Sequence, residues 1–84
     1  MIGFFKKIDR HSELMSGMAE RLGVDLGDEV AEHHIRAQDY RDALVRCTHC
    51  DNVGACVEWQ QENEHADVAP PYCRNRDLFS QLAE

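Results

Sequence analysis

The residues of this chain best suited to chemistry are its four cysteines, all in its second half. Their spacing is Cys47-x2-Cys50-x5-Cys56-x16-Cys73. Four cysteines complete a tetrahedral zinc site or hold one [4Fe–4S] cluster. The short gap between Cys47 and Cys50 lets both sulfurs turn toward one point, which Cys56 can reach from the first turn of a following helix. A long loop ending in Pro70-Pro71 would bring Cys73 back. We therefore predict one site built from all four.

The spacing favours an iron–sulfur cluster over zinc. Structural zinc sites usually consist of two tightly spaced pairs, whereas this chain has one tight pair, one looser cysteine and one distant cysteine. Arginines also adjoin the predicted ligands: Arg46 precedes Cys47, and Arg74 and Arg76 follow Cys73. Four thiolates and an oxidised [4Fe–4S] core carry a net charge of about 2−, which nearby cations stabilise. One Zn²⁺, two disulfides and four free thiols remain open as alternatives.

Aromatic residues and one histidine lie where they can surround this site. Trp59 falls three positions after Cys56 on the same helical face, and Tyr72 directly precedes Cys73. Both are expected to pack over the site and shield it from water and oxygen. His11 lies on an apolar stripe, which favours a hydrogen-bonded core or rim residue over a metal ligand.

The elements that must position these residues are helices. Apolar residues recur in steps of four and three along the first segment, which predicts a helix within residues 1–23 that ends at a left-handed Gly23. Further helices are predicted over about 28–35, 37–46 and 53–62, with a long loop over 63–71 and a last helix capped by Asn75. No two-residue alternation suggests a strand. The sequence predicts an all-α, compact bundle of four to five short helices, with the cysteine site at 47–73 joining its C-terminal half.

Length and charge restrict the possible classes of protein. A chain of 84 residues forms one domain, 1–84, and buries only about 60% of the surface that its unfolded form exposes, so a metal, disulfides or oligomerisation would help it to fold. A net charge of −7 and a pI near 5.1 argue against nucleic acid. No apolar run is long enough to span a membrane. Lys6, Lys7, Asp9 and Arg10 occupy positions where a signal peptide is apolar, so we expect a cytoplasmic protein with reduced thiols.

The first helix also offers a predicted interface. Its apolar stripe is most simply a core face, but its heptad spacing would also let it pair with a second copy or dock on a protein partner. The residues assigned to this interface are Phe4, Phe5, Ile8, Met15 and Met18. The chain has no Ser–His–Asp arrangement, phosphate loop or metalloprotease motif, so we do not expect an enzyme.

Two resemblances accompany these patterns. The segment from Cys47 to Cys56 resembles cluster-binding segments of the fumarate–nitrate oxygen-sensing regulators and WhiB-type regulators, which implies a ligand pattern and no DNA binding. The chain as a whole resembles a bacterial family of short proteins classed as a domain of unknown function. That resemblance rests on Asp9-Arg10-His11-x2-Leu14-Met15-x2-Met18, Leu22-Gly23-Val24, Arg46-Cys47-x2-Cys50 and Tyr72-Cys73-x-Asn75. It implies a compact helical fold and no particular activity.

Three functional hypotheses follow. The first is a small iron–sulfur protein that transfers electrons, or senses oxygen or redox state, through a protein partner. The second is a zinc-stabilised helical interaction module without redox chemistry. The third is a metal-free interaction protein whose thiols are buried or paired. The first is the one that the spacing and the neighbouring arginines favour.

Overall fold

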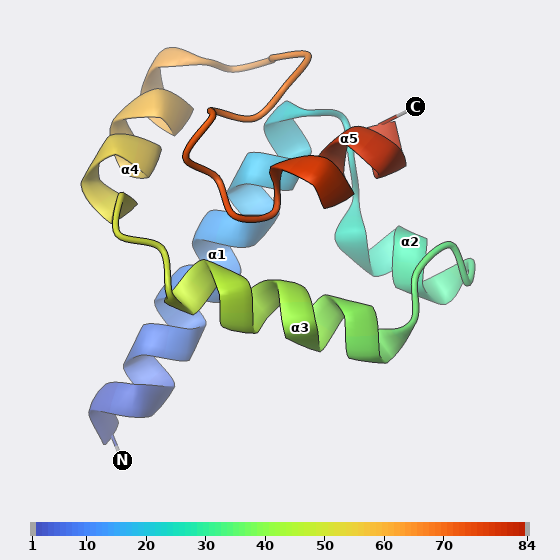
Figure 1. Ribbon diagram of the computed structural model, residues 1–84, viewed down its shortest axis with the longest axis horizontal. Coiled ribbons are helices and arrows are strands. Elements are labelled where there is room, and N and C mark those ends of the chain that lie inside the picture. Colours follow the sequence, from blue (N-terminus) through green and yellow to red (C-terminus); the bar gives the residue numbers. More distant parts are fainter. Residues whose placement is uncertain (1, 84) are drawn as a thin grey trace.

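The first helix, α1 (Ile2–Arg21), is the longest element, and the rest of the chain gathers around its C-terminal half (Figure 1). The computed structural model describes residues 2–83, without the side chains of Ile2 and Phe4. As predicted, α1 ends at a left-handed glycine, since Gly23 has a φ of 78°. Its N–H donates to Glu20 O at 3.0 Å and the N–H of Val24 donates to Ala19 O at 2.9 Å, which together form a Schellman cap.

The next two helices, α2 (Leu26–Ala31) and α3 (Ala37–Thr48), differ from the predicted ranges. α2 begins earlier because the side chain of Asp25 accepts the N–H of Asp28 at 3.0 Å and caps the helix. It also ends earlier, and His33 turns the chain with a φ of 62°. α3 runs two residues beyond the predicted end, so Cys47 lies within its last turn. Asp39 caps its start by accepting the N–H of Arg36 at 2.9 Å.

The last two helices, α4 (Val53–Glu62) and α5 (Arg76–Ala83), lie where the sequence predicts them. The connection between them is longer than predicted and runs from residue 63 to 75. It is held to α1 where the N–H of Ala66 donates to Arg21 O at 2.9 Å. Asn75 lies at the predicted capping position of α5, where its carbonyl accepts the N–H of Phe79 at 3.0 Å. Its side chain, however, is 3% exposed and bonds Arg46 and Ala43 of α3.

The core lies where α3 and α4 pack on α1, with α2 against α3. It contains Phe79 from α5 together with Met15, Met18, Ala19, Leu22, Val24, Leu26, Ala43 and Ala69. The molecule measures 35 × 29 × 17 Å, so it is less than two helix diameters of about 10–12 Å thick. The prediction of an all-α fold is confirmed, with five helices and no strand within residues 2–83. No helix in this range combines the length and the apolar character needed to cross a membrane.

Candidate functional site

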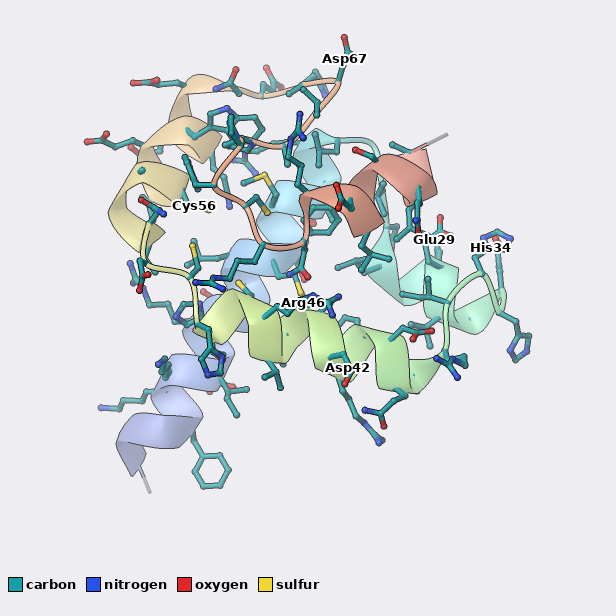
Figure 2. All side chains as sticks on the ribbon, in the orientation of Figure 1. Glu29, His34, Asp42, Arg46, Cys56 and Asp67 are labelled. Atoms are coloured by element: carbon teal, nitrogen blue, oxygen red, sulfur yellow. The ribbon has the colours of Figure 1, made fainter. Side chains whose placement is uncertain are left out.

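The four cysteines come from four neighbouring stretches of the chain and line one small cavity. Cys47 lies in the last turn of α3, Cys50 in the connection to α4, Cys56 near the start of α4 and Cys73 in the loop before α5. Figure 2 labels Cys56 on α4 and Arg46 on α3, which are the helices that flank this region. The remaining wall consists of His11, Leu14, Met15, Met18, Val53, Tyr72, Arg74, Asn75 and Phe79.

Short backbone turns set the direction of these cysteines. The N–H of Cys50 donates to Cys47 O at 3.0 Å and thereby closes the knuckle at the end of α3. The N–H of Cys56 donates to Asn52 O at 2.9 Å, which starts α4 directly after this knuckle. The N–H of Cys73 donates to Pro70 O at 3.0 Å, so the loop turns back toward the cavity. The two-residue gap and the proline pair thus bring all four cysteines to the lining of one cavity.

The sulfurs of Cys50 and Cys56 each accept a hydrogen bond from a residue that follows them closely in the chain. The backbone N–H of Asn52 donates to Cys50 Sγ at 3.4 Å. The side chain of Gln60 donates through Nε2 to Cys56 Sγ at 3.3 Å and to Leu14 O at 2.9 Å. Gln60 lies against α1 at a glycine, because a Cβ on Gly17 would collide with the Gln60 side chain. These donors are suited to sulfurs that carry negative charge.

The other two sulfurs also have nitrogen neighbours. His11 Nδ1 lies 3.6 Å from Cys47 Sγ, and this thiol lies equally close to the His11 carbonyl oxygen. The backbone N–H of Asn75 donates to Cys73 and favours its thiolate. Each of the four cysteines therefore has one N–H donor or one imidazole nitrogen beside its sulfur. Hydrogen bonds of this kind tune metal–thiolate sites.

Burial nevertheless favours the neutral form of three of these thiols, those of Cys47, Cys56 and Cys73. Burial, followed by the neighbouring charges of Cys50, Cys56 and Cys73, raises the pKa of Cys47 from 9.0 to about 11. Burial is also the main cause that raises the pKa of Cys56 and of Cys73. Four thiolates in one partly buried cavity repel one another, so a bound cation is needed to stabilise them together.

The spacing of the sulfurs bears on the kind of metal group that fits. Zinc at about 2.3 Å from each sulfur would hold them within about 4 Å of one another. Within residues 2–83, no three side chains among Cys, His, Asp and Glu are grouped closely enough to bind one ion. In a cubane each cysteine binds a different iron, so its ligands stand further apart. The open space between them is about 30 Å³, so rim side chains must move outward before a cluster fits.

The residues predicted to surround the ligands divide into two groups. Tyr72 and Arg74 line the cavity, and Arg74 also forms an exposed ion pair with Asp51 at 3.9 Å. The other three, Arg46, Arg76 and Trp59, lie outside the lining of the cavity. Arg46 donates through Nε to Asn75 Oδ1 at 2.8 Å, and Arg76 donates through Nε to Ala69 O at 3.3 Å. Trp59 packs against the core from α4.

Sequence reasoning missed three polar contacts in or beside the cavity. Gln60 follows Cys56 by four positions, and this helical spacing is the signal that could have identified it. The apolar stripe predicts His11 as a hydrogen-bonded core or rim residue, and only the fold shows that its imidazole lies beside Cys47. The side chain of Asn75 bridges Arg46 and Ala43, donating to Ala43 O at 2.8 Å, and no local pattern predicts this bridge.

The predicted interface on α1 is wrong for two of its residues. Met15 and Met18 are each 2% exposed and belong to the chain's own core, so they offer no surface to a partner. Phe5 is 60% exposed and Ile8 is half-buried, which leaves these two on the outer half of α1. The side chain of Phe4 lies outside the described part of the structure.

A second, larger hollow lies between α1, α2 and α3. It has a volume of about 580 Å³ and is lined by Ser16, Glu20, Val24, Asp25, Leu26, Gly27, Val30, Ala37, Tyr40 and Arg41. None of these lining residues is a cysteine or a histidine. The four candidate ligands therefore all lie in the smaller cavity.

Fold and site together define a small all-α protein with a four-cysteine cavity beside its core. The chain belongs to a family of unknown function, DUF6455, which covers residues 2–84. The resemblance to a family of unknown function is therefore confirmed. No curated protein and no solved structure matches the chain.

Proposed function

We propose that this protein binds a [4Fe–4S] cluster on Cys47, Cys50, Cys56 and Cys73. The cluster serves electron transfer, or the sensing of oxygen or redox state, for a protein partner in the cytoplasm. One observation carries the proposal: four cysteines from separate stretches line one cavity, each with a nitrogen beside its sulfur. Neutral buried thiols packed as ordinary core residues have no need of four such neighbours.

The surroundings of the cavity support an anionic cofactor. Arg74 lines the cavity, and the charge of Arg21 lowers the pKa of Cys56 against the effect of burial. These cations partly offset the net charge of about 2− of a cluster with four thiolate ligands. In this otherwise acidic chain, acidic residues such as Asp67 lie on the outer surface (Figure 2).

The apolar wall of the cavity supports redox chemistry in particular. Met15, Met18 and Phe79 are each exposed by 2% or less and separate the cysteines from solvent on the core side. Exclusion of water protects a cluster from hydrolysis and contributes to its potential. When bound, the cluster would supply one-electron chemistry, while the chain holds the sulfurs, provides N–H donors and keeps water away. We assign no catalytic residue, so the protein is proposed to act as a carrier or sensor and not as an enzyme.

The test is to prepare the protein without oxygen and to measure iron, sulfide and absorption. We expect a brown protein with absorbance near 400 nm and about four irons per chain. Cys73→Ser should lose this absorbance, whereas Ala55→Ser, at an exposed position beside Cys56, should keep it. Colourless wild-type protein that takes up no iron after anaerobic reconstitution would exclude the proposal.

The small size of the open space favours a second candidate. A volume of about 30 Å³ has room for a single ion without outward movement of the rim, although the sulfurs would have to move together, since no three side chains within residues 2–83 are grouped closely enough to bind one ion. A structural zinc would then link α3, α4 and the loop before α5. The protein would then be a helical interaction module whose metal only maintains the fold. One zinc per chain by elemental analysis, together with unfolding by a chelator and no bound iron, would establish this alternative.

A further inference from the structure

We infer that His11 is a positioning residue that raises the reduction potential of the cluster by donating a hydrogen bond to Cys47. This inference rests on the proposed function and adds a specific control of its redox chemistry. His11 comes from α1, a helix that carries no cysteine, and it lies 36 residues before Cys47. Its imidazole is the contribution of α1 to the polar surroundings of the sulfurs, next to the apolar Leu14, Met15 and Met18.

The position of His11 distinguishes it from the other histidines. It is 5% exposed and lines the cysteine cavity, whereas His33, His34, His49 and His65 are all exposed. Burying an imidazole costs free energy unless it is hydrogen-bonded. The fold provides its partners on Cys47: Sγ lies 3.6 Å from Nδ1, and a backbone hydrogen bond to Cys47 partly offsets the burial that lowers the pKa of His11. These contacts account for a polar residue on the buried stripe of α1.

The direction of the hydrogen bond follows from the state of the sulfur. A metal-bound Cys47 is a thiolate that has lost its proton, so it can only accept. His11 must then carry its N–H on Nδ1, because the other tautomer would direct a lone pair at a negative sulfur. A thiolate on Cys47 therefore requires one tautomer of His11. In the structure the Cys47 thiol can donate to the His11 carbonyl at 3.6 Å, and the imidazole Nδ1 lies at the same distance from Sγ.

The effect on the potential has a definite sign. Reduction adds one electron to the cluster, from the 2+ to the 1+ core state, and the sulfurs become more negative. An N–H donor stabilises the reduced state more than the oxidised state, so it raises the potential. The electron comes from an external reductant such as dithionite, and no proton is transferred by His11. Removing the donor must lower the potential while the four ligands stay in place.

The experiment compares two substitutions at this position in cluster-loaded, full-length protein. His11→Leu keeps a comparable volume without a donor, and His11→Asn returns an N–H close to the place of Nδ1. We expect the first to lower the reduction equilibrium constant about tenfold, which is about 59 mV for one electron. The second should restore most of the loss. His65→Leu, which removes an exposed histidine, is the control and should leave the potential unchanged.

A loaded His11→Leu protein with the wild-type potential would overturn the inference and leave the proposed function intact. A wild-type protein that binds no cluster would instead overturn the proposed function, so the two failures differ. If the His11→Leu protein does not bind a cluster, the hydrogen bond is tested in wild-type protein labelled with nitrogen-15 histidine. Pulsed electron paramagnetic resonance of the reduced cluster then measures the coupling to the imidazole nitrogen. A weak coupling to one imidazole supports the hydrogen bond. No coupling, or one as strong as that of a directly bound nitrogen, contradicts it.

Discussion

Asn75 is the residue whose replacement tests most directly how the last quarter of the chain is held in place. Its Oδ1 accepts a hydrogen bond from Arg46 Nε at 2.8 Å, and its Nδ2 donates to Ala43 O at 2.8 Å. Both partners lie on α3, so this side chain fixes the start of α5 against that helix. Its backbone N–H also donates to Cys73. Asn75→Ala removes the two side-chain bonds and keeps the backbone donor.

The expected loss of stability follows from the two bonds. A hydrogen bond from a charged donor contributes about 1.5–3 kcal/mol and a neutral one about 1 kcal/mol. Arg46 is exposed, so its guanidinium regains water and the charged bond counts at the lower end of its range. We therefore expect Asn75→Ala to lower the free energy of unfolding by about 2.5 kcal/mol. For a domain of this size that corresponds to a fall in Tm of about 10–20 °C.

The assay is urea denaturation of the metal-free protein, followed by helical circular dichroism. The matched control is Asn52→Ala, because Asn52 is exposed and its side chain makes no capping hydrogen bond. That substitution should change stability by less than about 0.5 kcal/mol. If Asn75→Ala were no more destabilising than this control, the bridge to α3 would not hold the C-terminal segment, and the reasoning would be wrong.

Three further predictions concern the helix end, the core and pH. Gly23→Ala should cost about 1 kcal/mol in the same denaturation assay, because Gly23 has a φ of 78° and a Cβ is strained there; an unchanged midpoint would contradict the cap. Phe79→Ala should cost about 3–5 kcal/mol, since Phe79 is 1% exposed, and hydrogen exchange should show α5 opening first. Because folding raises the pKa of Cys47 to about 11, the metal-free protein should keep this contribution below pH 9 and lose it as the pH rises through about 11. If the free energy of unfolding were the same at pH 9 and above pH 11, the inference that burial raises the pKa of Cys47 would be wrong.

The helices were predictable because their signals are local. The apolar stripe of α1, the glycine after it and the proline pair before α5 each act within a few residues. Predictions failed where a side chain had two possible partners. Asp25 starts α2 ahead of the predicted first residue, and Asn75 turns from the end of its own helix toward α3. Local sequence cannot rank a nearby backbone N–H against a carbonyl on another helix.

The candidate site was likewise predictable where its signals are local and unpredictable where it depends on distant contacts. The spacing of Cys47, Cys50 and Cys56 is local, and by itself it indicates a knuckle followed by a helix. The position of Cys73 depends on a loop whose path is set by its contact with Arg21 and by burial of Ala69. The second role of α1, as a source of His11 beside the sulfurs, arises only when α3 crosses it.

On its own, the sequence determined the helical class, the apolar stripe of the first helix and the four cysteines as candidate ligands. Periodicity and residue chemistry are properties of neighbouring positions, so they are present before the chain folds. Only the tertiary structure decided that Met15 and Met18 are core residues with no surface to offer a partner, and that the cysteines line one cavity. It also decided which nitrogen lies beside each sulfur. These outcomes depend on contacts between residues far apart in the chain, and packing selects such contacts only when all five helices are in place.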